Sequence, residues 1–167
     1  MPYSLWLMPE GLARRRLMQI VQELSKRHGG PEFPPHVTLF GNCEGQRDAL
    51  IEKSKRVAAS LHPFAVRLGT MGMTERYFRD LFVHVGPADV LRSAHRAACE
   101  ILGSKADPHF MPHLSLLYGN HPRDLKELIM TGISSKLRVQ FKVRSLYLLQ
   151  TEGDVQNWQE VARFPVT

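Results

Sequence analysis

Two short segments of the chain each place a hydroxyl residue two positions after a histidine. The first segment pairs His36 with Thr38, and the second pairs His113 with Ser115. If both segments are strands, the two side chains of each pair face the same side, about 6.5–7 Å apart along the strand. If the two strands also face one another, the site holds two imidazoles and two hydroxyls.

This set of groups suits the transfer of a phosphoryl group. The attacking and leaving oxygens lie roughly in line in such a reaction, so a base is needed on one side of phosphorus and an acid on the other. Histidine, whose ordinary pKa is about 6.5, serves in either role at neutral pH. Hydroxyls can donate hydrogen bonds to the non-bridging oxygens. A cyclic phosphodiester is the expected target, because its ring strain supplies reactivity that would otherwise require a metal ion.

The regions around the two histidines repeat each other. Residues 31–40 and 108–117 share five of ten positions without a gap, and the second copy follows the first by about 77 residues. With their flanks, the motif copies span 31–42 and 108–120. The repeat indicates an internal duplication, which predicts two similar lobes about a pseudo-dyad with a cleft between them. Because no low-complexity linker divides the copies, we expect one intertwined domain over 1–167.

Strands and helices are expected to alternate along the chain. Apolar residues at helical spacing predict helices over 10–28, 46–60, 88–103 and 122–132. The expected strands are 3–8, 36–41, 64–71, 77–86, 113–118, 137–149 and 158–164. The strand 137–149 alternates apolar with mostly basic residues, which indicates one buried face and one solvated, basic face.

Composition limits the classes of protein to consider. A hydrophobic content of 43% over 167 residues is typical of an ordinary globular domain, and a net charge of +6 favours anionic partners such as phosphates, nucleic acid or a membrane surface. No stretch approaches the ~20 apolar residues that cross a bilayer. Cys43 and Cys99 are too few for a disulfide framework, so we expect free thiols in a reducing, cytoplasmic compartment. We expect no metal site, because no spacing typical of zinc ligands accompanies the histidines. We also expect a monomer that needs no cofactor.

The tetrapeptides His36–Leu39 and His113–Leu116 resemble the paired His-x-Thr/Ser signatures of the 2H phosphoesterase superfamily. The opening Tyr3–Trp6 with Pro9 is similar to the cyclic phosphodiesterase branch of that superfamily, and the resemblance extends over nearly the whole chain. It implies an α+β fold with two pseudo-symmetric lobes, antiparallel sheets lining a central cleft, and helices outside. It also implies metal-independent hydrolysis of ADP-ribose 1″,2″-cyclic phosphate or nucleoside 2′,3′-cyclic phosphates.

The resemblance also implies roles for individual residues. His113 is the implied base that activates water, His36 the implied acid, and Thr38 and Ser115 the implied phosphate ligands. Two aromatic residues are implied contacts of the substrate: Tyr118, and Trp6 as a stacking partner for a base. Tyr118 has the opposite parity to His113 along the strand, so it reaches the cleft only if the chain turns there.

Other chemically active side chains are expected to be structural. His84 either faces the cleft or is a hydrogen-bonded core or rim residue, and the second position is favoured. His109 and His121 flank the second motif, and His109 lies outside the repeated chemistry because it corresponds to Glu32 in the first copy. Tyr77 and Arg79 are either contacts of a ligand or surface residues, with the surface slightly favoured. Trp158 and Phe164 are expected in the core.

Two alternatives share the same cleft. One is an enzyme that processes RNA ends bearing a 2′,3′-cyclic phosphate. The other is a non-catalytic module that binds RNA ends, which the basic charge favours and which predicts strongly salt-dependent affinity. Two complete His-x-Thr/Ser pairs argue against the module, because binding alone does not need two imidazoles. The expected partner is a small cyclic nucleotide, with RNA ends as the alternative and no membrane.

Overall fold

The computed structural model describes residues 1–167. Amphipathic segments form four helices, which are α1 (Gly11–His28), α2 (Arg47–Ser60), α3 (Ala88–Leu102) and α4 (Arg123–Ile133). The strands are β1 (Tyr3–Leu7), β2 (Val37–Cys43), β3 (Ala65–Met73), β4 (Leu81–Gly86), β5 (His113–Leu117), β6 (Gln140–Lys142), β7 (Ser145–Gln150) and β8 (Gln159–Pro165). Short 3₁₀ turns cover Tyr77–Arg79, Ser134–Leu137 and Val155–Asn157.

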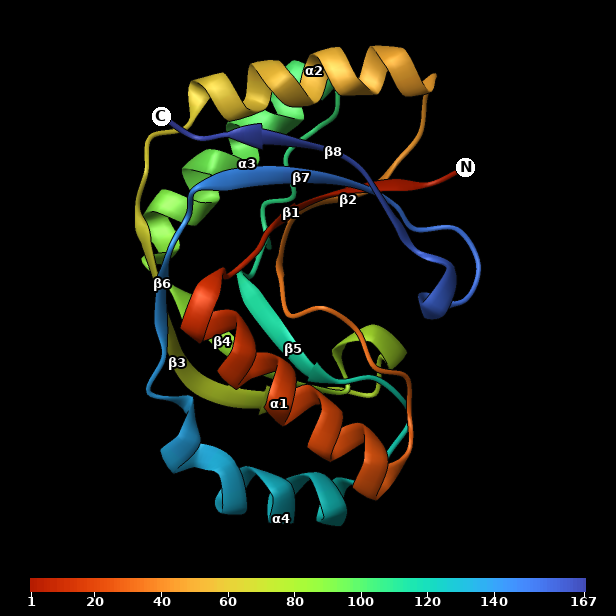
Figure 1. Ribbon diagram of the computed structural model, residues 1–167, viewed down its shortest axis with the longest axis vertical. Helices are drawn as coiled ribbons and strands as arrows, with labels where there is room; N and C mark the ends of the chain where they lie inside the picture. Colours follow the sequence, from red (N-terminus) through yellow and green to blue (C-terminus); the bar gives the residue numbers. More distant parts are fainter.

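The eight strands form one antiparallel sheet with the order β6-β3-β4-β5-β2-β1-β7-β8. The order is symmetrical about its centre, because β5 and β4 on one side correspond to β2 and β1 on the other. The two halves join where Val37 of β2 pairs with Leu114 of β5. The expected pair of antiparallel sheets is therefore present, joined at its middle into one (Figure 1).

The helices divide between the two halves of the sheet. At one end of the molecule α2 packs on β7 and β8, and α3 packs on β2; at the other end α1 packs on β5 and α4 on β3 (Figure 1). Thus α1, which follows β1 in the chain, covers a strand of the opposite half, and α3 does the same from the other side. This exchange ties the halves together around a shared core, in which Val37 and Leu114 are fully buried.

Two expected strands are wrong in extent. Residues 77–86 begin with the 3₁₀ turn Tyr77–Arg79, and only Leu81–Gly86 extend along the sheet. The turn forms because the buried Asp80 and the neighbouring Thr74 hold the chain in a compact loop.

The single strand expected over 137–149 is two strands. β6 pairs with β3 at one edge of the sheet, whereas β7 pairs with β1 in the other half. The buried face predicted from the apolar alternation is confirmed. The buried residues are Leu137, Val139, Phe141 and Val143. The burial pattern does not show which neighbouring strand a segment pairs with. The apolar alternation therefore could not show that the chain crosses from one half of the sheet to the other between β6 and β7.

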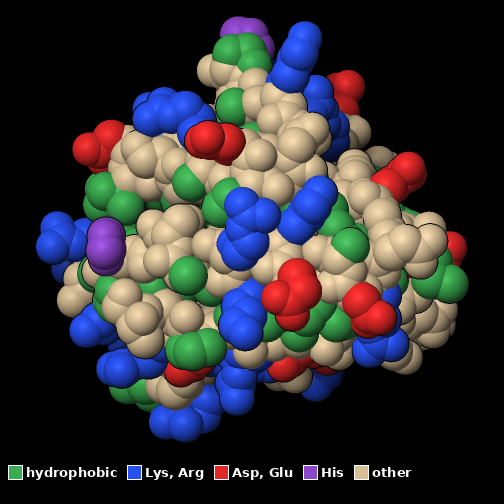
Figure 2. All heavy atoms as spheres, turned by 90° about the horizontal axis from the view of Figure 1, so that it is seen from above, with side chains coloured by type: hydrophobic (Ala, Val, Ile, Leu, Met, Phe, Trp, Pro, Cys, Tyr) green, Lys and Arg blue, Asp and Glu red, His purple; other side chains and the backbone are tan.

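The surface carries the net positive charge without concentrating it on the face seen in Figure 2. There the Lys and Arg side chains are scattered and Asp and Glu side chains lie among them. Cys43 and Cys99 are buried and unpaired. No helix is both long enough and apolar enough to span a bilayer.

Candidate active site

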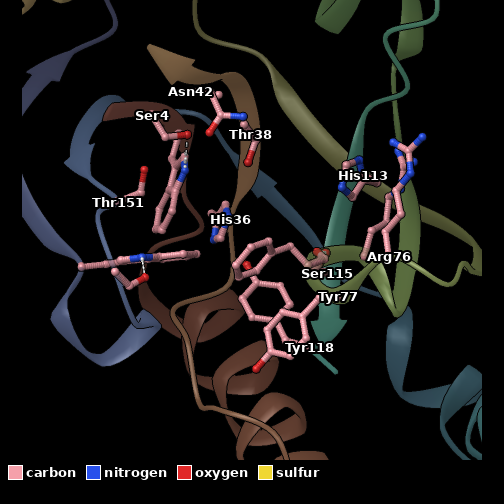
Figure 3. A pocket seen from close by; sticks show the side chains of 16 residues that line it. Ser4, His36, Thr38, Asn42, Arg76, Tyr77, His113, Ser115, Tyr118 and Thr151 are labelled. Carbon is pink, nitrogen blue, oxygen red and sulfur yellow. Dashed lines mark hydrogen bonds between the residues drawn. The ribbon is translucent and has the colours of Figure 1, made fainter. Parts of the chain in front are cut away.

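A cleft of about 510 Å³ lies over the junction of the two halves of the sheet. A volume of this size accommodates a small ligand. All six site residues expected from the sequence line it, together with residues of the β3–β4 loop and of the segment before β8 (Figure 3). The lining residues are Ser4, Trp6, His36, Thr38, Gly41, Asn42, Arg76, Tyr77, Phe78, Arg79, His113, Ser115, Tyr118, Thr151, Gly153 and Trp158.

The pairing of β2 with β5 brings the two motifs together. Val37 lies opposite Leu114, and both side chains enter the core. Continuing this antiparallel register puts His36 across from Ser115, and Thr38 across from His113. Because side chains alternate along strands, all four of these groups face away from the core, into the cleft (Figure 3).

The same kind of hydrogen bond orients both imidazoles. His36 Nδ1 lies 2.7 Å from the carbonyl oxygen of Pro34, and His113 Nδ1 lies 2.9 Å from that of Met111. A carbonyl only accepts, so each Nδ1 carries the proton and donates it. This leaves each Nε2 as the atom that can take up or release a proton during a reaction.

Burial favours the neutral form of both imidazoles. It lowers the pKa of His36 to about 4, a shift that the hydrogen bond to Pro34 opposes and the proximity of His113 adds to. Burial also lowers the pKa of His113, where the positive charge of Arg79 adds to the effect. His113 is less enclosed than His36, which is 7% exposed. An anion bound between the rings would raise both pKa values.

The lowered pKa of His36 predicts a loss of stability in mild acid. Between about pH 6.5 and pH 4 the unfolded chain binds a proton at His36 that the folded chain does not bind. The free energy of unfolding therefore decreases as the pH falls through this range, by up to about 3 kcal/mol. We expect His36→Asn to flatten this part of the pH dependence in denaturant titrations. His62→Asn, a change at an exposed histidine, should keep the wild-type slope; equal slopes in all three proteins would contradict the prediction.

The hydroxyls of Ser115 and Thr38 differ in burial and in their hydrogen bonds within the protein. Ser115 is buried, and its Oγ donates to the carbonyl oxygen of Phe78 at 2.9 Å. Thr38 is half-buried and lines the cleft. Thr38 is therefore ready to meet a ligand, whereas the Ser115 hydroxyl must first turn away from the Phe78 carbonyl to donate elsewhere.

The Trp6 ring stacks on the His36 ring. The ring centroids are 3.5 Å apart and the planes differ by 4°. Trp6 Nε1 donates to Ser4 Oγ at 2.8 Å, which fixes the indole. One face of the indole is thus occupied by the imidazole, and Trp158 meets it edge-on at 5.7 Å.

Tyr118 reaches the cleft because β5 ends at Leu117 and the chain turns after it. Its ring stacks on Phe33, with centroids 3.6 Å apart. Burial raises the pKa of Tyr118, so its hydroxyl stays protonated and available as a donor. The turn depends on a close approach from the segment after α1, because a Cβ at Gly30 would lie 2.4 Å from the Tyr118 carbonyl oxygen.

The cleft also contains lining residues beyond the six expected from the sequence. Trp158, expected in the core, is only partly buried and lines the cleft. Tyr77 and Arg79, for which a surface position was slightly favoured over a ligand contact, line it as well. Arg76 and Phe78 join them, with Phe78 52% exposed. The charged and aromatic residues 75–79 were the sequence feature that could have predicted this wall of the cleft. On an expected strand, however, the same residue types are also typical of a solvent-exposed face. His84 does not line the cleft, as expected.

The loop that carries these residues is anchored below the surface. Lys126 Nζ donates to Asp80 Oδ1 and to the carbonyl oxygen of Thr74, each at 2.8 Å, so one ammonium group joins both ends of the loop. His121 Nδ1 contacts the other oxygen of Asp80. Burial by itself would raise the pKa of Asp80, but the hydrogen bonds from Lys126 and His121 outweigh it and lower that pKa. His121 therefore supports the loop from outside the cleft.

The structure contains no group of three His, Cys, Asp or Glu side chains arranged to hold a metal ion.

Comparisons with known proteins agree with this geometry. The sequence of residues 9–155 matches the family model of the 2′-5′ RNA ligase superfamily. A cyclic phosphodiesterase of Arabidopsis thaliana is 22% identical, over 96% of this chain and 92% of that protein. TT0787 of Thermus thermophilus has a similar structure, with a TM-score of 0.69, 19% identity and coverage of 99% and 98% of the two chains. LigT of E. coli in complex with 3′-AMP gives a TM-score of 0.62, 14% identity and coverage of 99% and 97%. The expected α+β fold is confirmed.

Proposed function

The chain belongs to the 2′-5′ RNA ligase superfamily of 2H phosphoesterases, and from that membership we propose that it hydrolyses small cyclic phosphates to phosphomonoesters. The observation that carries the proposal is the pair of imidazoles in one cleft, each oriented by a carbonyl group two residues earlier. The catalytic unit is one two-lobed domain over 1–167 that arose by internal duplication, acts as a monomer, and uses neither cofactor nor metal.

The reaction needs one proton acceptor and one proton donor. Nε2 of His113 takes a proton from a water molecule as the water oxygen bonds to phosphorus. The bond from phosphorus to one ring oxygen breaks, and Nε2 of a protonated His36 gives that oxygen a proton. One water molecule is consumed and a monoester is released. The two histidines exchange protonation states, and proton exchange with solvent restores them.

Two contacts favour this direction, and the one at His36 acts against burial, which lowers the pKa of His36 to about 4 and so favours the neutral form of that ring. His113 is the less enclosed ring, and the charge of Arg79 favours its neutral form, as a base requires. His36 lies flat on the face of Trp6, and an aromatic face stabilises a cation placed over it. This contact favours the imidazolium form that the acid needs once the phosphate anion has bound.

The remaining groups hold the substrate. Thr38 and Ser115 donate hydrogen bonds to the non-bridging oxygens, Ser115 after its hydroxyl turns from the Phe78 carbonyl. The neutral hydroxyl of Tyr118 is a further donor. Trp6 is the proposed stacking partner of the base, which must displace present neighbours of the indole, because that ring is only 2% exposed and already stacks on His36.

The proposed substrates are ADP-ribose 1″,2″-cyclic phosphate and nucleoside 2′,3′-cyclic phosphates. The similar protein of Arabidopsis thaliana is named a cyclic phosphodiesterase. LigT of E. coli forms a complex with 3′-AMP, which is one of the two monoesters that ring opening of 2′,3′-cyclic AMP can give. A cleft of about 510 Å³ agrees with a ligand of this size.

Incubation with each substrate in excess EDTA tests the proposal. We expect phosphorus NMR to show conversion of at least one of these cyclic phosphates to a monoester, and the product to show which ring bond breaks. The enzyme without its two histidines, His36→Ala with His113→Ala, is the control. If the wild type leaves both substrates unchanged, the proposed reaction is wrong.

An RNA end is the alternative substrate, and the name of the superfamily and the net charge of +6 favour it. The same assay with an oligonucleotide that ends in a 2′,3′-cyclic phosphate separates the two. If the oligonucleotide has a higher kcat/KM than the cyclic mononucleotide, RNA ends are the substrate. Binding of the oligonucleotide without conversion would identify a recognition module.

A further inference from the structure

The loop between β3 and β4 brings two positive charges into the cleft. Arg76 and Arg79 both line it, and in the view of Figure 3 Arg76 lies on the His113 side of the cleft, away from His36. Neither guanidinium forms an ion pair with a carboxylate, and no Asp or Glu lines the cleft. The charge of the two arginines is therefore uncompensated within the protein.

Arg79 is partly withdrawn from water and lacks a partner. Its Nε is buried without a hydrogen bond, and its guanidinium carbon lies 5.9 Å from the centroid of the Phe82 ring. Burial, with the charge of Arg76 as a smaller contribution, lowers the pKa of Arg79. A buried donor without an acceptor is costly and rare. An anion that binds at this point would supply the acceptor and offset the repulsion between the two cations.

The loop is held in place before any ligand binds. Thr74 Oγ1 donates to the carbonyl oxygen of Arg79, and the backbone N–H of Arg76 donates to Thr74 Oγ1 at 3.2 Å. On the cleft side the N–H of Gly119 donates to the carbonyl oxygen of Tyr77 at 3.0 Å. Together with the Lys126 anchor, these bonds make the arginines part of a preorganised wall, unlike solitary surface cations.

The cleft offers more positive charge than the reacting group needs. A cyclic phosphate carries one negative charge, and the two hydroxyls with the two histidines already surround it in the proposed reaction. We propose, in an extension that rests on the proposed function, that Arg76 and Arg79 form a second anion subsite. This subsite binds a phosphate group of the substrate other than the one that reacts. The preferred substrates are then nucleotide cyclic phosphates that carry a further phosphate. Of the proposed substrates, ADP-ribose 1″,2″-cyclic phosphate carries such phosphates in its diphosphate bridge, and an unsubstituted nucleoside 2′,3′-cyclic phosphate does not.

Binding of two product-like ligands tests the subsite without any turnover. Calorimetric titration at one ionic strength compares adenosine 3′,5′-bisphosphate with 3′-AMP, which differ by one phosphate. We expect the wild type to bind the bisphosphate about tenfold or more tightly, since one charge-assisted contact amounts to about that factor. Arg76→Gln and Arg79→Gln should each reduce the ratio of the two affinities, and Arg79→Lys should reduce it less than Arg79→Gln.

Arg92→Gln is the matched control, because Arg92 is exposed on α3 and does not line the cleft. It makes the same change of charge and should leave the affinity ratio at its wild-type value. Equal wild-type affinities for the two ligands would overturn the subsite. An equal decrease of the affinities for both ligands in the Gln variants would also overturn the subsite, because the arginines would then bind the phosphate that reacts. Neither result depends on whether the protein is a catalyst.

Kinetics with three cyclic substrates identifies the source of the second phosphate. The reference substrate is 2′,3′-cyclic AMP, and its specificity constant is compared with those of two longer substrates. One is the same nucleotide bearing a terminal 5′-phosphate, and the other is a dinucleotide whose second phosphate is a bridging diester. The longer substrate that is preferred shows whether the subsite takes a terminal or a bridging phosphate.

Two other outcomes count against the proposals. If neither longer substrate is preferred over 2′,3′-cyclic AMP, the subsite is overturned. If none of the three is converted, the proposed function is overturned, and the ratio of binding affinities still decides the subsite. The two failures are therefore distinguishable.

Discussion

Replacement of His113 by alanine is expected to lower kcat/KM for the cyclic substrate by about 10²–10⁴-fold, and His36→Ala by a similar factor. This is the usual contribution of a positioned general acid or base. The two losses should not add in the double variant, because an acid and a base that act in one step fail together. Initial rates by phosphorus NMR or by product chromatography give the measurement.

Folding must be checked separately for these variants, since His36 packs against Trp6. Circular dichroism and the thermal midpoint of each variant serve this purpose. Asn at either position is the second variant, because it keeps polarity and approximate size without acid–base chemistry near neutral pH. Near-wild-type kcat/KM in any folded variant at either position would refute the two-histidine mechanism.

The same mechanism sets the shape of the pH profile. The rate should rise as the base loses its proton and fall as the acid loses its own, so kcat/KM is expected to be bell-shaped. Because burial lowers the pKa of both His36 and His113 in the free protein, the maximum of kcat/KM should lie below about pH 6.5. The maximum of kcat should lie at higher pH, because the bound phosphate raises both pKa values.

Lys126→Met is expected to lower the free energy of unfolding by about 3–5 kcal/mol, because it leaves the carboxylate of Asp80 buried without its cation. Asp80 is fully buried and Lys126 is 4% exposed, and the two are joined at 2.8 Å. The ammonium also binds the carbonyl oxygen of Thr74. The loss should therefore spread to the loop that carries Arg76 and Arg79. Urea titration measures the stability.

Lys136→Met provides the matched control. Lys136 also faces a carboxylate, that of Glu23 at 3.9 Å, but both side chains are exposed. An exposed pair contributes about 0–1 kcal/mol, so the control should change stability little. The double variant Asp80→Asn with Lys126→Met should be more stable than Lys126→Met alone, because no charge is left unpaired. A loss at Lys126 no larger than that at Lys136 would contradict the structural role of the buried pair.

Local sequence predicted the four polar groups that face the cleft from the two central strands. Each His-x-Thr/Ser pair sits on a strand whose alternate residues, such as Val37 and Leu114, are apolar. Alternation along a strand is fixed by covalent geometry, so the face of each pair could be predicted from a few letters. The repeat of the motif then predicted two matching halves, and the symmetrical order of the sheet agrees with that prediction.

Only the tertiary structure decided which other side chains surround that pair. Arg79 and Trp158 are 79 residues apart in the sequence, and they share the cleft because β3, β4 and β8 fold around its two sides. The strand expected over 137–149 divides between the two halves for the same kind of reason. Strand pairing depends on partners that are distant in sequence. The same holds for the buried ion pair that anchors the loop ending at Asp80. A local pattern of apolar and polar residues does not identify such partners.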